Sequence, residues 1–392
     1  MGKKVIFAEN KKIRENIARG NSVIEFKLNS GKKTGTTEIL TYPLHANKKF
    51  TGGMLDDDDQ MVEDFNVSDW KSFFLEDVEK ATQIVYTKKE NGNASHMAVF
   101  KLGGTYYIVA GSKNVHLVCR NREDMSLYGK QERYEVAMIT MKAVFDFLEE
   151  LPTEKRENLL KFLSETHQTA VFELLDPQDQ HIELLKNKKP ILKFITFTKA
   201  EQVKNEEEKS KGKTLCENPA KSLPMAAELG FDVVEHRVYE ASKLEEISND
   251  VRNTFYIEGS VLYFLNKEEN VIGVLKKKSI WYILVRATRE KMKNYAKEAN
   301  RGSITIVCNS VHEKMRSKLK KRFQEIKKWL NLTDDFVEKW ISLAHAMSAW
   351  LKANLINGSV NVKDIQRKFP ILWNRFLEQT NKTDNITPTF KC

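Results

Sequence analysis

Lys89 lies where a nucleophile could project from a rigid edge. It stands three residues before a glycine, in the segment Lys89–Gly92, between the β-prone runs 84–86 and 97–100. Asn and Gly tolerate the positive φ of a tight turn, so the pattern predicts a hairpin connection with Lys89 at its rim. A surface hairpin whose lysines only keep the chain soluble has the same local sequence, so a chemical role depends on other segments.

Three later segments carry side chains that phosphoryl transfer requires. Glu173 interrupts the apolar, strand-like run 168–175, and a charge there is costly to bury unless it is paired or bound to a metal. A second carboxylate, Glu258, precedes a glycine in a Glu-Gly-Ser-Val sequence. Lys276 and Lys278 lie two apart on a predicted strand, so they extend from one face while the lysine between them points away.

These residues suit chemistry at a phosphate. A free lysine has a pKa of ~10.4, so Lys89 needs nearby positive charge or desolvation to become a nucleophile at neutral pH. Lys276 and Lys278, together with Mg²⁺, could supply that field and clamp phosphate oxygens. Glu173 and Glu258 are candidates to orient a ribose and to hold Mg²⁺, which prefers carboxylate and phosphate oxygens.

In order and residue type, these segments resemble motifs of the covalent nucleotidyltransferase superfamily of ATP-dependent RNA and DNA ligases and mRNA capping enzymes, most closely its RNA ligases. Lys89–Gly92 resembles the nucleophile motif Lys-x-Asp/Asn-Gly, and Phe172-Glu173 resembles the central acidic motif. Glu258-Gly-Ser-Val resembles the fourth motif, and Val274–Tyr282 resembles the last motif with its two alternating lysines. The resemblance covers roughly residues 40 to 290.

Two further features bear on the resemblance. Gly111-Ser112-Lys113 is similar to the second motif of the ligases, although an ordinary β-turn explains it equally well. Lys48 lies about forty residues before Lys89, where phage-type RNA ligases usually have an arginine that contacts ATP phosphates. Lysine there is a departure, since it supplies charge without bidentate geometry.

The resemblance implies an ATP-dependent RNA ligase with Mg²⁺ (or Mn²⁺). Lys89 would attack the α-phosphorus of ATP, AMP would pass to an RNA 5′-phosphate, and an RNA 3′-hydroxyl would displace AMP. The implied catalytic residues are Lys89, Glu173, Glu258, Lys276 and Lys278, with Glu173 and Glu258 as metal ligands. The implied nucleotide-binding residues are Lys89, Glu90, Asn91, Gly92, Ser112, Lys113, Phe194, Phe197, Glu258, Lys276 and Lys278.

Other interpretations stay open at this point. Phe194 or Phe197 stacks on the base in one interpretation, and both pack in the core in the other. A guanylyltransferase or DNA ligase of the same superfamily usually carries an OB-fold after the last motif, whereas the pattern here turns helical. A non-catalytic RNA-binding protein on a ligase scaffold would not need all five catalytic side chains.

Charge is distributed unevenly along the 392 residues. Residues 290–392 hold 20 basic and 10 acidic side chains, whereas residues 1–289 hold 44 of each, so the formal excess of +10 lies in the last quarter. This suggests that a basic appendage meets a polyanion such as RNA, although a lysine-rich solvated face has the same composition. No run approaches the ~20 apolar residues of a membrane span, and no secretory signal is apparent. We therefore expect an intracellular monomer, in the cytoplasm or nucleus.

The patterning predicts an α+β fold. Residues 1–289 are expected to form an adenylyltransferase domain of antiparallel sheets with flanking helices, and residues 290–392 an all-α basic domain. A helix is predicted over 68–80 and two more over 134–165, and the charged stretch 199–224 is predicted to be an exposed loop. The acidic run 56–59 is interpreted as a solvated loop, because consecutive carboxylates cannot converge on a metal from regular structure.

Overall fold

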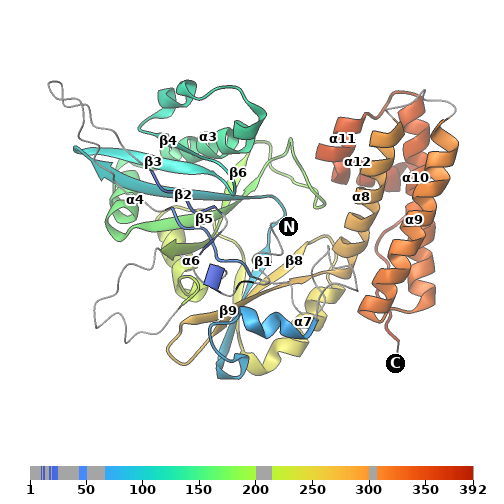
Figure 1. Cartoon of the computed structure of the whole chain (residues 1–392), viewed down its shortest axis with the longest axis horizontal. Coiled ribbons are helices and arrows are strands. Elements are labelled where there is room, and N and C mark those ends of the chain that lie inside the picture. The colour runs from blue at the N-terminus through green and yellow to red at the C-terminus, as the bar shows by residue number, and fades with distance from the viewer. Residues whose placement is uncertain are drawn as a thin grey trace.

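The computed structural model describes residues 67–199, 214–299 and 307–391, together with the short stretches 10, 12–13, 17–18, 20–24 and 44–50. The acidic run 56–59 and residues 200–213 of the predicted loop lie outside this part of the chain. Within the described part, no helix combines the length and apolar character needed to cross a membrane. The architecture is α+β, with two antiparallel sheets followed by a helical region (Figure 1).

A five-stranded sheet of order β4-β3-β2-β5-β6 forms one half of the larger body. Helices α3 and α4, which the sequence predicted, and α6 pack on one face of this sheet in a common apolar core (Figure 1). The elements are β2 (Asn93–Leu102), β3 (Thr105–Ser112), β4 (His116–Cys119), η3 (Arg122–Leu127), η4 (Glu132–Tyr134), α3 (Glu135–Glu150), α4 (Thr153–Thr166), β5 (Gln168–Leu175), β6 (Ile191–Lys199) and α6 (Pro219–Glu228).

A four-stranded sheet of order β7-β1-β8-β9 forms the other half. Helix α7 covers one of its faces, where Ile247 and Val251 pack on Leu262 and Leu275. The elements are η1 (Val67–Phe73), η2 (Val78–Lys80), β1 (Gln83–Lys89), β7 (His236–Glu240), η5 (Ala241–Lys243), α7 (Leu244–Asn253), β8 (Gly259–Leu265) and β9 (Val271–Lys278).

The predicted helix over 68–80 is wrong in type. Two 3₁₀ segments, η1 and η2, occupy this stretch instead of one α-helix. Between them the Leu75 N–H donates to the carbonyl of Ile272 in β9 at 2.7 Å, and an added Cβ at Gly273 would overlap the Phe74 ring. The backbone of this stretch therefore hydrogen-bonds to the edge strand β9. A continuous helix could not make this bond.

The predicted hairpin after Lys89 is also wrong. β1 pairs with β7 and β8, whereas β2 pairs with β3 and β5, so Glu90-Asn91-Gly92 crosses from one sheet to the other. Gly92 does not adopt a positive φ. An added Cβ at this position would lie 2.1 Å from the carbonyl oxygen of Leu174, so glycine is required for the close approach of the strands.

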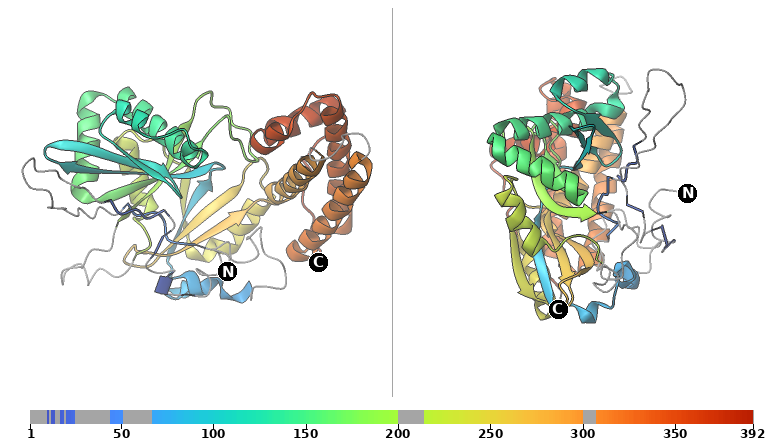
Figure 2. Two further views of the ribbon diagram at one scale, coloured as in Figure 1. Left: turned by 45° about the horizontal axis from the view of Figure 1, so that its top comes forward. Right: turned by 90° about the vertical axis from the view of Figure 1, so that its left-hand side faces the viewer.

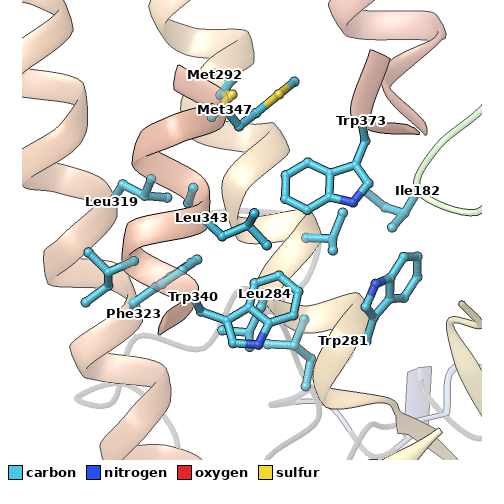
Figure 3. Packing of buried hydrophobic residues seen from close by; sticks show 14 of the residues in the cluster. Ile182, Trp281, Leu284, Met292, Leu319, Phe323, Trp340, Leu343, Met347 and Trp373 are labelled. Carbon is cyan, nitrogen blue, oxygen red and sulfur yellow. The ribbon is translucent and has the colours of Figure 1, made fainter. Parts of the chain in front are cut away.

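The helical region lies at one end of the molecule (Figures 1 and 2). It begins directly after β9, and the predicted domain boundary at 289/290 falls inside its first helix. Its core buries Trp281, Trp340 and Trp373, and it also takes in Ile182 from the β5–β6 loop (Figure 3). The helices are α8 (Ile280–Ala299), α9 (Val307–Leu330), α10 (Asp334–Ile356), α11 (Val362–Arg367) and α12 (Phe369–Thr380).

A buried carboxylate joins the C-terminal tail to this core. Asp384 is 2% exposed and accepts the indole N–H groups of Trp281 at 2.8 Å and Trp373 at 2.7 Å. The hydroxyl of Tyr256, two residues before Glu258, lies 3.3 Å from its second oxygen. The tail thereby contacts α8, α12 and the segment that leads into β8.

We expect Asp384→Ala to lower the free energy of unfolding by about 2–3 kcal/mol, because two buried indole N–H groups lose their acceptor. Chemical denaturation of purified protein measures this change. Asp250→Ala, at an exposed position of α7, is the matched control and should stay within about 0.5 kcal/mol of the parent. Equal effects of the two substitutions would contradict the assignment.

Candidate functional site

Lys89 ends β1 in a row of three residues that crosses the four-stranded sheet. It is paired with Gly259 of β8, which is paired in turn with Lys278 of β9. Two residues away along the same strands, on the same face of the sheet, a second row consists of Thr87, Val261 and Lys276. Lys89 and Lys278 therefore flank a position that has no side chain.

Gly259 cannot carry a side chain. Its φ is +143°, and an added Cβ would lie 2.0 Å from the carbonyl oxygen of Lys277 and 2.7 Å from Cα of Lys278. Any other residue would be strained and would force β8 and β9 apart. The glycine thus leaves an open position between the two lysines.

The three lysines Lys89, Lys276 and Lys278 share one face of the sheet. Val85, Val261 and Val274 pack together on this face, and side chains alternate along each strand. The predicted alternation in β9 is confirmed, because Lys277 belongs to the opposite face. Lys277 is nevertheless only 5% exposed, so it is not a solvated surface residue.

Glu258 holds the amine of Lys89. Its Oε1 lies 2.9 Å from Lys89 Nζ, and its Oε2 accepts the Asn91 side-chain amide at 2.6 Å. Its backbone is fixed as well, because its carbonyl accepts the Ser279 N–H at 3.0 Å and its N–H donates to the Glu183 carboxylate. Glu258 is 5% exposed, so protein groups surround its side chain and fix its orientation.

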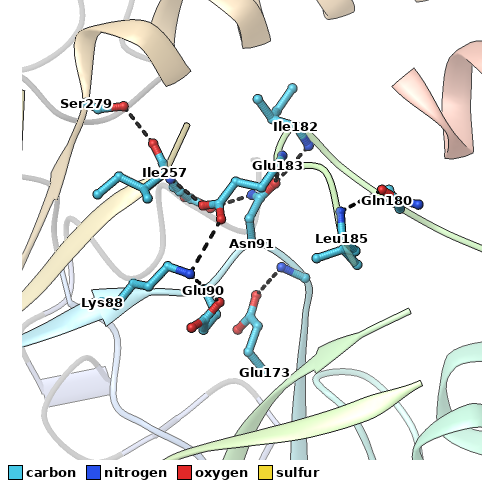
Figure 4. Close-up of polar contacts among 12 residues, drawn as sticks. Lys88, Glu90, Asn91, Glu173, Gln180, Ile182, Glu183, Leu185, Ile257 and Ser279 are labelled. Atoms are coloured by element: carbon cyan, nitrogen blue, oxygen red, sulfur yellow. Dashed lines mark hydrogen bonds and ion pairs between the residues drawn. The ribbon is translucent and has the colours of Figure 1, made fainter. Parts of the chain in front are cut away.

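Asn91 connects the crossing segment to the β5–β6 loop (Figure 4). Its Oδ1 accepts the backbone N–H groups of Ile182 at 2.8 Å and Glu183 at 3.0 Å, while its Nδ2 donates to Glu258. The residue is 3% exposed. An asparagine is required by this arrangement, because an aspartate could not donate to Glu258.

Glu173 lies on β5, across from the crossing segment. Its Oε1 accepts the Gly92 N–H at 3.0 Å. Burial raises the pKa of Glu173 to about 7, which Lys89 partly offsets and the charge of Glu258 reinforces. The protonated form of Glu173 is therefore favoured relative to that of a solvent-exposed glutamate.

The amine of Lys89 is held in its charged form. Burial lowers the pKa of Lys89, but the charges of Glu258 and Glu173 outweigh burial, so the pKa lies above its ordinary value. The sequence suggested that Lys276 and Lys278 would dominate the field at this amine. In the folded chain the two carboxylates dominate instead.

Glu183, His181 and Tyr282 are site residues that the sequence analysis missed. Glu183 is 7% exposed, and burial raises its pKa to about 8. Burial also lowers the pKa of His181, with a further contribution from the charge of Arg289. Tyr282 is 5% exposed, and Lys278 Nζ lies 5.4 Å from its ring centre. A lone glutamate between Ile182 and Leu184 was the only sequence signal for this loop.

Phe194 and Phe197 do not face a nucleotide. Both are 0% exposed and pack with Phe172 and Phe231 beneath the helical layer. Their ring centres are 4.6 Å apart. The prediction that one of them stacks on a base is therefore wrong, and the core interpretation holds for both.

Ser112 and Lys113 lie in the turn between β3 and β4, and Ser112 pairs with Ser95 of β2. The Ser112 N–H donates to the Val115 carbonyl at 2.8 Å, and the Asn114 N–H donates to Ser112 Oγ at 3.4 Å. These contacts are those of an ordinary turn. A ligand contact by Ser112 or Lys113 stays a prediction.

Lys48 belongs to the described stretch 44–50. Phe50, two residues later, packs with Val261 and Val274 on the face that carries Lys89. The segment therefore lies on the expected face of the sheet. A contact between Lys48 and phosphate stays a prediction.

Among residues 67–199, 214–299 and 307–391 and the shorter described stretches, no group of three or more His, Cys, Asp or Glu side chains forms a ready metal cluster. Burial raises the pKa of Glu173, and repulsion from the charge of Glu258 raises it further. A divalent cation bound there would relieve this repulsion. The donor chemistry thus fits a cation that takes its other ligands from phosphate and water.

We expect Glu173→Gln to flatten the pH dependence of stability. The pKa of Glu173 is about 7 in the folded chain against an ordinary value of 4.5, so its contribution is fully present below about pH 4.5 and is lost as the pH rises through about 7. Gln removes this titration but keeps an oxygen for the Gly92 N–H. Denaturation midpoints between pH 4.5 and 7.5 measure the effect, with the exposed Glu157→Gln as control. A parent and variant with parallel profiles would refute the raised pKa.

Comparisons with known proteins give one family and several similar folds. No curated protein matches the sequence. An archaeal ATP-dependent RNA ligase is 13% identical, with 91% of this chain and 79% of that chain covered and a TM-score of 0.45. Two variants of an RNA ligase from Naegleria gruberi, both solved with ATP and Mn, are 15% identical, with TM-scores of 0.32 and 0.35.

The two Naegleria matches cover 53% and 54% of this chain and 52% and 55% of the matched chains. A protein-family model described as "Domain of unknown function (DUF7920)" matches residues 66–289. Because this match spans more than half of the 392 residues, the chain belongs to the DUF7920 family.

Proposed function

We propose that this protein is an ATP-dependent RNA ligase and that Lys89 is its nucleophile. One observation carries the proposal: the amine of Lys89 meets the carboxylate of Glu258 at 2.9 Å, on the sheet face that also carries Lys276 and Lys278. The amine of Lys89, the carboxylates of Glu173 and Glu258 and the cations of Lys276 and Lys278 together meet the needs of a covalent reaction at phosphorus.

In the first step Lys89 Nζ bonds to the α-phosphorus of ATP, and the bond from that phosphorus to the bridging oxygen of pyrophosphate breaks. The amine must lose a proton to solvent, and Glu258, 2.9 Å away, positions the amine. Lys276 and Lys278 offset the negative charge on the phosphates. Little covalent assistance is needed, since positioning and charge neutralisation dominate phosphoryl transfer.

In the later steps AMP leaves Lys89 for the 5′-phosphate of an RNA, and an RNA 3′-hydroxyl then displaces AMP as the phosphodiester forms. The same pocket serves all three steps, because each one makes or breaks a bond to the adenylate phosphorus or its neighbour. The open position at Gly259 gives room for a phosphate between Lys89 and Lys278.

Glu173 and Glu258 would hold a divalent cation, Mg²⁺ or Mn²⁺. When bound, it would neutralise charge on the phosphates and on both carboxylates. These are the same carboxylates that hold the pKa of Lys89 above its ordinary value in the ligand-free protein. Glu258 would then be less able to retain the lysine in its charged form.

Lys89→Ala should abolish a covalent protein–AMP adduct, whereas Lys88→Ala should retain most of it. Lys88 lies on the opposite side of β1, where it meets Glu90 at 3.3 Å and Glu183 at 3.9 Å, so it is a closely matched control. Radiolabelled ATP followed by a denaturing gel measures the adduct, and intact mass confirms addition of one AMP.

An adduct that survives in Lys89→Ala would refute the nucleophile. Equal labelling with GTP would indicate a guanylyltransferase, and an adduct transferred only to nicked DNA would indicate a DNA ligase. A parent that forms no adduct with any nucleotide would refute the enzyme and leave a binding protein.

Lys276→Met and Lys278→Met should each lower the rate of adduct formation by about 10²–10³-fold, the usual cost of removing one charge-stabilising donor. Lys277→Met should change the rate only a few-fold, because its side chain extends from the other face. Methionine preserves the buried stem in each variant. Single-turnover labelling at saturating ATP measures the rates, and melting temperatures exclude unfolding. A loss in folded Lys277→Met as large as in its neighbours would contradict the assignment.

A further inference from the structure

Helix α8 carries a row of cations that begins at the candidate site. Arg286, Arg289, Lys293 and Lys297 follow Tyr282 at intervals of four, three, four and four residues. Side chains at these intervals lie on one face of a helix. We refer to these four residues as the α8 stripe.

The α8 stripe lies away from the apolar core of the helical region. The core side of α8 is formed by Leu284, Met292 and Ala296, which are buried in the main helical cluster. Along the stripe, exposure rises with distance from the site: Arg286, Arg289 and Lys293 are half-buried, and Lys297 is exposed. At 1.5 Å per residue the stripe spans roughly 17 Å.

The first residue of the stripe, Arg286, lies one helical turn from Tyr282 of the candidate site. The ring centre of Tyr282, in the first turn of α8, lies 5.4 Å from Lys278 Nζ, and Lys278 shares a row of the sheet with Gly259 and Lys89. Arg286 follows one helical turn later, ~6 Å along the axis. A polyanion that follows the stripe therefore ends beside Lys89.

Arg289 is fixed in place within the stripe. Its side chain is 12% exposed, with Nη1 3.0 Å from Glu290 and Nη2 donating to the Gln366 carbonyl at 2.8 Å. These contacts hold its guanidinium charge in the inner half of the stripe.

Helix α9 also carries exposed lysines on one face. Lys314, Lys318, Lys321 and Lys328 recur at intervals of four, three and seven residues, and Lys327 pairs with Asp334. Of these two helices, α8 is the one whose first turn follows β9, so its row of cations is the one that starts beside Lys278.

We propose that the α8 stripe binds the phosphate backbone of single-stranded RNA and guides its end to Lys89. This rests on the proposed function and adds the path of the substrate to it. One cation per helical turn suits a strand whose successive phosphates each meet a charge, as in grooves that track single-stranded nucleic acid.

The test uses two variants that each lose the same charge. Lys293→Gln/Lys297→Gln removes the outer half of the stripe, and Lys320→Gln/Lys321→Gln removes two exposed lysines from α9. Fluorescence anisotropy with a 5′-phosphorylated single-stranded RNA, without ATP, gives the binding constant at several KCl concentrations. ATP labelling without RNA checks that both variants retain an intact site.

The stripe variant should bind RNA more weakly, and the slope of log binding constant against log salt should fall by about 1.4, or ~0.7 for each phosphate that the protein no longer neutralises. The α9 variant should change the slope by less than the value for one phosphate. Equal reductions in both variants, or none in the stripe variant, would overturn the proposal. Displacement of the RNA by poly-glutamate of equal charge would overturn it in favour of an acidic protein partner.

The ligase function and the RNA path can be refuted independently of each other. If the parent forms no AMP adduct but the stripe variant loses RNA binding, the ligase function is wrong and the RNA path holds. If the adduct forms and RNA binding depends equally on both helices, the ligase function holds and the path is wrong.

Discussion

The contact between Glu258 and Lys89 is the interaction on which the rest of the site depends. One oxygen of the carboxylate meets the amine at 2.9 Å and the other meets Asn91 at 2.6 Å, so a single side chain ties the end of β1 to the segment that crosses between the sheets. Buried charges are tolerated only with such partners. The other sheet is joined through Asn91, whose Oδ1 accepts the Ile182 and Glu183 N–H groups of the β5–β6 loop, and through Glu173, which accepts the Gly92 N–H.

The electrostatics of the ligand-free site follow from this contact. Two carboxylates, Glu258 and Glu173, raise the pKa of Lys89, while burial raises that of Glu173. The site therefore favours the protonated form of its amine. In the proposed reaction, nucleotide phosphates and a cation change the partners of these carboxylates, which couples substrate binding to release of the amine.

The helical region is linked to the same contact through two routes. The β5–β6 loop places Glu183 against the backbone of Glu258 and Ile182 in the helical core. Helix α8 begins two residues after Lys278, and the ring centre of Tyr282 in its first turn lies 5.4 Å from Lys278 Nζ. In the proposed function, a helical region attached in this way would present RNA to the site.

Local pattern determined much of this protein, since alternation in β9, the helices over 134–165 and the helical last quarter follow from the spacing of apolar residues. The order of Lys89, Glu173, Glu258, Lys276 and Lys278 was likewise visible in the sequence. Only the tertiary structure decided that β1 and β2 belong to different sheets, that Phe194 and Phe197 are buried and that Glu183 joins the site. These outcomes depend on which strands pair across long sequence separations, and residue spacing within one segment carries no information about such pairing.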